Sequence, residues 1–512
     1  MVRLRANAFT DNRIYSFCRE LSKRNLLDNS HPHNLFDTGN LANLRSLPAN
    51  IYAGFDPTAE SLHVGNLLVI SNLLRSSLYG CNPIALIGGA TALIGDPSGR
   101  NTDRPQLSRD CVRENSKNIV KQLAEILEHG RDMFEDRIRL TILNNIDWYE
   151  NKSMIDFLRM GRHFRVGEML RLKTIRNRME STGISYTEFS YQILQSYDWF
   201  MLSKKYDCFF QLGGADQLGH LDSGADYIKR LTGRQSVGVC LPLINDKHGN
   251  KLGKSTLEVG SSLWLDSSKT SPFALLQYFR QLHDDDAEKL LIYYSLRPYE
   301  EIEALIKHHR ENLGRWIAQN ALADEIVTLV HGRSALDKAT QCSNVLFNGS
   351  LNDFENLDHD TISKIFAGPL TFQLSKHDIS TVADLANATK SKGSTLVKTG
   401  ALKLNGIKVT DPDYLLDHSN LMLKNRYSLL MTYSKLQLRV LRVYKDFLKT
   451  LDKTNNQQIT SDTVRQAFKE NATSIDKSNL LFVESQLRLA ERRLDQIKTG
   501  SINKISTFSI KR

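Results

Sequence analysis

YAGFDPTAESLHVGN, at residues 52–66, joins the end of a strand pattern to the start of a helical pattern. Its first residues are apolar, the chain turns through Gly54 and Pro57, and the helical pattern of residues 67–80 follows. A second apolar run, PIALIGGAT at residues 83–91, comes after that helix. Strand, helix and strand within about 40 residues predict a βαβ unit with parallel pairing.

The strand pattern returns later in the same region. DCFFQLGGADQLGH, residues 207–220, indicates a strand, a glycine turn and a helix start, and VGVCLPLI, residues 237–244, indicates another buried strand. Residues 108–200 are mostly helical in pattern. We therefore expect an α/β, Rossmann-like parallel sheet with a helical segment inserted between its two halves.

The chain beyond residue 272 has a different pattern. Residues 273–345 carry helical periodicity with many charges, and Asn405-Gly406 between KL and IKV is a hairpin signal. No apolar run approaches the ~18 residues that a membrane span requires. The predicted regions are an N-terminal segment at 1–50 with a helix over 14–27, an α/β domain at 51–272 with its insertion at 115–195, a helical domain at 273–380, a small α+β domain at 381–443 and a helical extension at 444–512.

Composition and charge indicate which partners and which kinds of site the protein can have. The formal net charge of +10 and the pI near 9.1 favour polyanionic partners such as nucleic acid or nucleotides. The six cysteines form no CxxC, which argues against a zinc site and against a disulfide framework. Near the N-terminus, Arg3, Arg5 and Arg13 face only Asp11, which fits either a short mitochondrial presequence or a frayed basic end.

Two short motifs lie where a nucleotide could bind. His63-Val64-Gly65-Asn66 follows a predicted strand and begins a helix, where backbone N–H groups and the helix dipole attract anions. A capping turn with a surface histidine explains the same four residues. In the second motif, Lys251-Leu252-Gly253-Lys254-Ser255, two lysines and a hydroxyl on a glycine loop could surround a polyphosphate, although loop lysines are usually just solvated.

Together these motifs resemble the HIGH and KMSKS signatures of class I aminoacyl-tRNA synthetases. Five segments, YAGFDPTAESLHVGNLL, IALIGGATALIGDPSGR, TEFSYQILQSYD, LGGADQLGH and KLGKS, resemble the tyrosyl-tRNA synthetases in particular, in their mitochondrial or bacterial branch. The resemblance spans residues 50–345 and continues more weakly to about 440.

The resemblance implies a tyrosine pocket. The phenol hydroxyl of the substrate would meet Tyr52 and Asp198, where a carboxylate and a phenol can read a hydroxyl. A buried carboxylate would offset the desolvation of the substrate ammonium. The residues implied for the ammonium are Asp96, Tyr191 and Gln195, with Asp56 beside them and Gln217 near the substrate carboxylate. Without the resemblance, Tyr191, Gln195 and Asp198 could be a polar seam on one helical face.

The resemblance also implies a nucleotide site. Asp216 would hold the ribose, and Gly54, Gly65 and Gly213 would let ATP approach the backbone. Asn66 would contact the ribose side of the nucleotide. The residues implied for the phosphates are Thr58, His63, Lys251, Lys254, Ser255, Arg100 and Arg104.

Several residues depart from the family pattern. Asn66 stands where the signature has its second histidine, so a hydrogen-bond donor remains but a chargeable imidazole is lost. Leu252-Gly253 replaces Met-Ser in the loop motif. Leu218 and His220 stand where bacterial members usually have Trp and Asn, and His220 would alter either a packing contact or a tRNA-facing contact.

The activity implied is tyrosine–tRNA ligation. Tyrosine would be activated with ATP, a substrate accompanied by Mg²⁺, and transferred to the 3′ end of tRNA(Tyr). The resemblance implies no organic cofactor, no structural metal and no membrane partner. It implies a homodimer through the 115–195 insertion, where residues 155–164 match the family, an anticodon-binding role for 273–380 and an RNA-binding role for 381–443. Mitochondrial matrix is the expected location, with cytoplasm as the alternative.

Three other interpretations remain open from the sequence. The protein could be an RNA-binding protein that kept the fold and lost the chemistry, although the intact lysines argue against this. It could be a tryptophanyl relative, although Tyr52 and Asp198 favour a phenol over an indole. A nucleotidyltransferase with only the HxGH turn would lack both the tyrosine pocket and a C-terminal RNA-binding domain.

Overall fold

The computed structural model divides the chain into two compact units. Unit 1 comprises residues 1–270, 275–306 and 318–335, and unit 2 comprises 271–274, 307–317 and 336–512. The domain boundaries expected from the sequence stay predictions. The residues that the structure describes are 13–33, 35, 44–99, 102–244, 263–347, 356, 380–389, 393–398, 402–405, 407–416 and 430–432.

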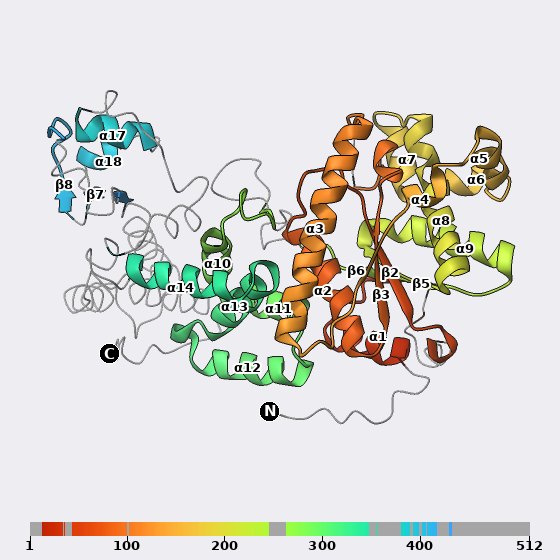
Figure 1. The fold of residues 1–512 in the computed structure, drawn as a ribbon, viewed down its shortest axis with the longest axis horizontal. Helices are drawn as coiled ribbons and strands as arrows, with labels where there is room; N and C mark the ends of the chain where they lie inside the picture. Colours follow the sequence, from red (N-terminus) through yellow and green to blue (C-terminus); the bar gives the residue numbers. More distant parts are fainter. Residues whose placement is uncertain are drawn as a thin grey trace, which may run out of the picture. The chain divides into compact units, whose positions relative to one another are not determined.

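Unit 1 is built on a six-stranded sheet in the order β1-β6-β5-β2-β3-β4. Five strands pair in parallel, and β1 pairs antiparallel with β6 at one edge. Strands β2, β3, β5 and β6 of this sheet are labelled in Figure 1. The α/β, Rossmann-like core is therefore confirmed. The strands are β1(Asn29–His31), β2(Asn50–Phe55), β3(Asn82–Ile87), β4(Thr141–Asn144), β5(Phe210–Gly214) and β6(Val237–Leu241).

Strand β2 lies at the centre of the sheet, between β3 and β5. Its apolar residues are buried because parallel strands are covered on both faces. Gly54 is the exception: it is exposed, and a methyl group placed there would meet no atom within 4 Å. The carboxyl end of the central strand therefore borders open space.

Helices cover both halves of the sheet. Helix α2 starts at Val64 rather than at residue 67, because His63 caps it, and α1 ends at Lys23 rather than at residue 27. Strands β1 and β4 were missed because they are only three and four residues long, without an apolar run that stands out. The helices around the sheet are α1(Arg13–Lys23), α2(Val64–Leu78), α3(Arg109–Met133), α8(Tyr186–Tyr206) and α9(Leu218–Thr232).

The predicted insertion is mostly helical, with β4 inside it. After α3, four short helices lead to α8. Ser153 caps α5 with a reciprocal bond to Asp156, and Gly183 with φ of 83° ends the turn before α8. The four short helices are α4(Ile146–Tyr149), α5(Met154–Gly161), α6(Val166–Met169) and α7(Lys173–Glu180).

Residues 272–347 are mostly helical, as predicted for 273–345. Two buried arginines, Arg24 and Arg75, donate to the carbonyl of Ser295 just beyond α11, at 2.9 and 2.6 Å. The hydroxyl of Tyr294 donates to the carbonyl of Val64 at 2.9 Å. This end of α11 is thereby fixed to α2. The helices of the region are α10(Pro272–Arg280), α11(Asp284–Tyr294), α12(Tyr299–Glu311), α13(Ile317–His331) and α14(Arg333–Phe347).

Later in unit 2 there is a small α+β fold. Asn405, with φ of 48°, joins two antiparallel strands, so the predicted hairpin is confirmed. Its core includes Val382, Val397 and Leu402. The elements are α17(Val382–Thr389), α18(Gly393–Lys398), β7(Leu402–Leu404), β8(Ile407–Val409) and β9(Leu430–Thr432), with strand order β8-β7-β9.

The described part of the chain has no helix that combines the length and the apolar character needed to cross a membrane. The predicted helix beyond residue 444 lies outside the described residues, as do Arg3, Arg5 and Asp11 of the N-terminus.

Candidate active site

The predicted site residues of unit 1 gather at one edge of the sheet. Because β3 and β5 lie on opposite sides of β2, the carboxyl end of β2 is a topological switch point, where open α/β sheets bind ligands. Asp56 follows β2, Asp96 follows β3 and Asp216 follows β5. Helix α8 supplies Tyr191, Gln195 and Asp198.

Tyr52 carries a buried hydroxyl that lacks a partner within the described part of the chain. The side chain is 1% exposed and its ring lies 6.1 Å from that of Trp199. Burial first, and then the charge of nearby Asp198, raise the pKa of Tyr52 well above its usual range. A buried unpaired hydroxyl is costly in the free protein, so a ligand that pairs with it gains binding energy.

Asp198 is held beside this hydroxyl by two donors. Its carboxylate accepts hydrogen bonds from Asn145 Nδ2 at 3.0 Å and from Trp148 Nε1 at 2.8 Å. Burial raises the pKa of Asp198 to about 7, although these two donors oppose the rise. The structure thus brings the buried side chains of Tyr52 and Asp198 close together, and their role toward a phenol stays a prediction.

Asp56 and Tyr191 are bonded to each other. The Tyr191 hydroxyl donates to Asp56 Oδ2 at 2.7 Å, and Thr91 Oγ1 donates to Asp56 Oδ1 at 2.7 Å. Burial raises the pKa of Asp56 to about 6. A Cβ atom at Gly88 would lie 1.8 Å from Asp56 Oδ1, so only glycine leaves room for this carboxylate. The Tyr191 oxygen keeps lone pairs that can accept from a ligand ammonium.

Asp96 is the carboxylate best suited to a cation. It accepts from the Ser98 amide at 2.8 Å and from Gln217 Nε2 at 2.9 Å, and His220 Nε2 lies 3.3 Å away. Burial acts to raise the pKa of Asp96, but the bonds from His220 and Ser98 outweigh it and bring the pKa well below its usual range. Asp96 is therefore ionised at neutral pH. Gln195 also has a buried side-chain oxygen that no described residue bonds.

Sequence reasoning missed some members of this network. Asn145, which is fully buried, donates to Thr91 and Asp198 and accepts from the Ala90 amide at 2.7 Å. It follows β4, the strand that was not predicted. The sequence left the role of His220 open, and the structure shows its Nε2 between Ser98 and Asp96, at 3.1 and 3.3 Å.

His63 and Asn66 form a reciprocal cap at the start of α2. His63 Nδ1 accepts from the Asn66 amide at 3.3 Å, and Asn66 Oδ1 accepts from the His63 amide at 3.1 Å. A Cβ atom at Gly65 would lie 2.8 Å from the His63 ring. The interpretation of these residues as a capping turn is therefore correct. It is compatible with a nucleotide site, because the cap fixes both side chains at the helix N-terminus.

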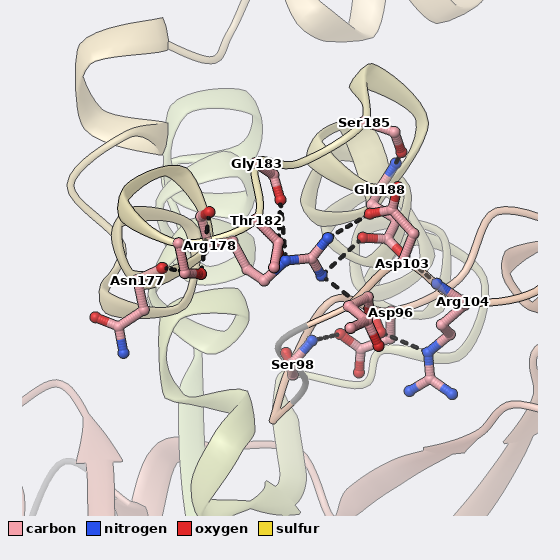
Figure 2. A network of polar contacts seen from close by, with 12 residues as sticks. Asp96, Ser98, Asp103, Arg104, Asn177, Arg178, Thr182, Gly183, Ser185 and Glu188 are labelled. Carbon is pink, nitrogen blue, oxygen red and sulfur yellow. Dashed lines mark hydrogen bonds and ion pairs between the residues drawn. The ribbon is translucent and has the colours of Figure 1, made fainter.

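The other predicted nucleotide residues divide into two groups. Thr58 follows Asp56, where its amide donates to the Asp56 carbonyl at 2.8 Å, and Gly213 lies at the end of β5 beside Gln217. Arg104 Nε donates to the main-chain carbonyl of Asp96 at 2.6 Å, which holds the arginine side chain against the backbone of the segment after β3 (Figure 2). The predicted residues Arg100, Lys251, Lys254 and Ser255 lie outside the described residues.

Metal ligands do not cluster in the part of the chain that the structure describes. It contains no group of three or more His, Cys, Asp or Glu side chains placed to hold an ion. A Mg²⁺ ion that entered with a nucleotide would need no such group, because phosphates and water supply most of its ligands. The carboxylates, phenols and amides of the described site have the chemistry to bind an amino acid and a nucleotide.

Comparisons with known proteins agree with this geometry. Residues 45–348 match the family of class I tRNA synthetases (W and Y). A mitochondrial tyrosine–tRNA ligase of Drosophila melanogaster is 38% identical over 80% of this chain and 93% of its own. The human mitochondrial tyrosine–tRNA ligase is 38% identical over 77% and 84%, and the tyrosine–tRNA ligase of Lactococcus lactis is 37% identical over 74% and 89%.

A solved structure is similar as well. The C-terminally truncated mitochondrial tyrosyl-tRNA synthetase of Aspergillus nidulans has a TM-score of 0.58 at 30% identity, over 65% of this chain and 94% of its own. The chain therefore belongs to the class I tRNA synthetases, in their tyrosyl branch. The resemblance seen in the sequence is confirmed.

Proposed function

We propose that the protein is a tyrosine–tRNA ligase. It activates tyrosine with ATP to tyrosyl-adenylate and pyrophosphate, and then transfers tyrosine to the 3′ end of tRNA(Tyr). The observation that carries this assignment is the buried Tyr52 hydroxyl, which lies near Asp198 and which no described residue bonds. Relatives of this chain that bear the name tyrosine–tRNA ligase support it.

The site accounts for selection of tyrosine at both ends of the amino acid. The phenol hydroxyl pairs with Tyr52 and Asp198, and a ligand without that hydroxyl leaves the buried Tyr52 hydroxyl without a partner among the described residues. Tyrosyl-tRNA synthetases are themselves a known example of a site that rejects an analogue lacking the hydroxyl it binds. The substrate ammonium binds the ionised Asp96, with Tyr191 and Gln195 as further acceptors.

The first step needs positioning and charge rather than a base. The carboxylate of tyrosine is already ionised at neutral pH, and it attacks the α-phosphorus of ATP as pyrophosphate leaves. His63, Thr58 and Arg104 line the phosphate side, and donors there stabilise charge that develops on the phosphoryl oxygens. Asn66 and Asp216 contact the ribose of ATP. Arg100, Lys251, Lys254 and Ser255 act on the pyrophosphate, and Mg²⁺ enters with ATP.

The insertion supplies the surface for a second copy of the chain. Its helices α5 and α6 and the first residue of α8 expose large apolar side chains. Large exposed apolar patches mark interaction sites. The exposed fractions are 75% for Met154, 57% for Ile155, 57% for Leu158, 61% for Val166 and 70% for Tyr186. We propose a homodimer through this surface.

The proposed location is the mitochondrial matrix. It is supported by the mitochondrial names of relatives from three animals among the similar proteins and by the arginine-rich N-terminus. The proposed RNA partner is tRNA(Tyr), bound by the regions after residue 272. Because phosphate contacts release counterions, its affinity should fall as salt rises.

The first test is amino-acid-dependent ATP–pyrophosphate exchange, with tyrosine, phenylalanine and tryptophan in parallel. Exchange with tyrosine alone supports the proposal. Exchange with tryptophan would assign the chain to tryptophan activation instead. Folded protein that exchanges with none of the three would favour an RNA-binding protein that has lost the chemistry.

A further inference from the structure

Arg178 is a buried arginine that the proposed mechanism does not use. It lies on α7 of the insertion and is 1% exposed. Its guanidinium donates to the carbonyl of Gly183 at 3.0 Å and to the carbonyl of Thr102 at 3.3 Å, and it pairs with the carboxylate of Asp103 (Figure 2). It also lies 3.1 Å from Glu188 Oε2. The insertion is thus bonded to a segment near the active site.

Glu188 links Arg178 to Arg104. Its side chain is 3% exposed in the first turn of α8, where Ser185 caps the helix. Its Oε2 faces Arg178, and its Oε1 accepts from the Arg104 amide at 2.7 Å. Arg104 Nε then donates to the carbonyl of Asp96 at 2.6 Å. One ion pair, between Arg178 and Glu188, and two hydrogen bonds therefore join α7 to Arg104 and Asp96 of the site.

The segment that carries Arg104 needs this support. Residues 102–107 contain no helix or strand, and Thr102 and Asp103 are exposed. Such a segment has few buried contacts of its own to fix its backbone. Its described bonds to the interior run to Arg178, to Glu188 and to the Asp96 carbonyl.

The chemistry of this position calls for arginine. Four acceptors surround one planar guanidinium, and two of them are carboxylates. The rigid fork of arginine reaches several acceptors at once, whereas a lysine ammonium is a point donor. A lysine at 178 would keep the charge and lose part of the geometry.

We propose that Arg178 is a positioning residue for the activation step, which acts through Glu188 and the 102–104 segment to hold Arg104 against the leaving pyrophosphate. This inference rests on the proposed function. It also means that the insertion, whose surface we assign to the second copy, bears on the rate of tyrosine activation. A displacement of about 1 Å in a charge-stabilising group can cost on the order of 10²-fold in rate.

The test measures tyrosine-dependent ATP–pyrophosphate exchange in four variants of the full chain. They are Arg178→Met, Arg104→Ala, the double variant, and Arg176→Met as the matched control, an exposed arginine on the same helix. We expect Arg178→Met to lower kcat by about 10- to 100-fold, with the KM for tyrosine changed less than about threefold. In the Arg104→Ala background the same substitution should change kcat less than about threefold.

A purely structural role predicts a different pattern. An unchanged kcat in Arg178→Met, or an equal fall in both backgrounds, overturns the proposal. Removing one partner of a buried ion pair is strongly destabilising, so circular dichroism and thermal unfolding accompany each assay. If Arg178→Met does not fold, Arg178→Lys and Glu188→Gln are measured in both backgrounds against the same criterion. A wild-type chain without exchange would refute the proposed function itself, before any variant is compared.

Discussion

Removing the hydroxyl of Tyr52 should weaken tyrosine recognition without weakening the fold. In the free protein this buried hydroxyl has no described partner, so Tyr52→Phe breaks no described hydrogen bond there. An unsatisfied buried polar group costs roughly 1–3 kcal/mol, part of which the substitution relieves. We expect the free energy of unfolding to stay the same or to rise by up to about 1 kcal/mol, and the melting temperature to rise by up to about 1–2 °C.

The same substitution removes a bond to bound tyrosine. A neutral hydrogen bond is worth about 0.5–1.5 kcal/mol net, so kcat/KM for tyrosine should fall about 2- to 12-fold. The kcat/KM for phenylalanine should stay the same or increase. ATP–pyrophosphate exchange with the two amino acids gives both numbers, and thermal unfolding with and without tyrosine gives the stability.

Tyr294→Phe is the matched control. It removes a buried tyrosine hydroxyl too, but this one donates to the Val64 carbonyl at 2.9 Å. Its loss should destabilise the protein by about 1 kcal/mol. If Tyr52→Phe lowers the melting temperature as much as Tyr294→Phe does, and leaves the kinetics for tyrosine unchanged, the reasoning about Tyr52 is wrong.

Three further predictions concern Asp198, the cap of α2 and the surface of the insertion. Burial raises the pKa of Asp198 in the folded protein to about 7, above its ordinary value near 4. The ionised carboxylate therefore lowers the free energy of unfolding at pH 8, and this loss of stability becomes smaller as the pH falls below 7. Asp198→Asn should therefore flatten the change in unfolding free energy between pH 8 and pH 5, measured by denaturant titration, while tyrosine exchange falls. Asn66→Ala removes half of the cap on α2 and should cost about 1 kcal/mol of stability, measured the same way at pH 7. Leu158→Asp places a charge on the exposed apolar face of the insertion and should turn the proposed dimer into a monomer in sedimentation experiments.

Each of these has a result that would contradict it. A variant Asp198→Asn with the same pH slope as the parent would show that this carboxyl does not control the slope. Asn66→Ala with unchanged stability would mean that the cap is already satisfied by other groups. A Leu158→Asp protein that sediments as the parent does would remove the insertion surface from the proposed dimer.

Strong local patterns were sufficient to predict the centre of the fold. The apolar runs around Tyr52, Ile84 and Val239 are long enough to mark buried parallel strands, and the asparagine–glycine pair at 405–406 fits the hairpin that the structure contains. The three-residue strand β1 carries no such pattern. This strand forms because it pairs with β6 at the edge of the sheet, and that pairing is a tertiary contact.

Site residues that stand in a family motif could be predicted from the sequence. Residues that reach the site only through packing of the folded chain could not. Asp96 and Tyr191 stand in quoted motifs, and the structure places both in one polar network. Asn145 and Arg178 belong to no such motif, and nothing in their local sequence marks them as buried. Their partners Asp198 and Glu188 are 53 and 10 residues away, so only the folded chain brings them together.

Helix α1 sets a limit on how the N-terminus can be processed. Ile14, Phe17 and Leu21 are buried in unit 1, and Arg24, just after the helix, bonds the residues that follow α11. A protease that removed a targeting leader past Arg13 would take part of this core with it. Any cleavage that preserves this core must therefore leave the chain intact from about residue 13 onward, and a protein that starts later should be unstable.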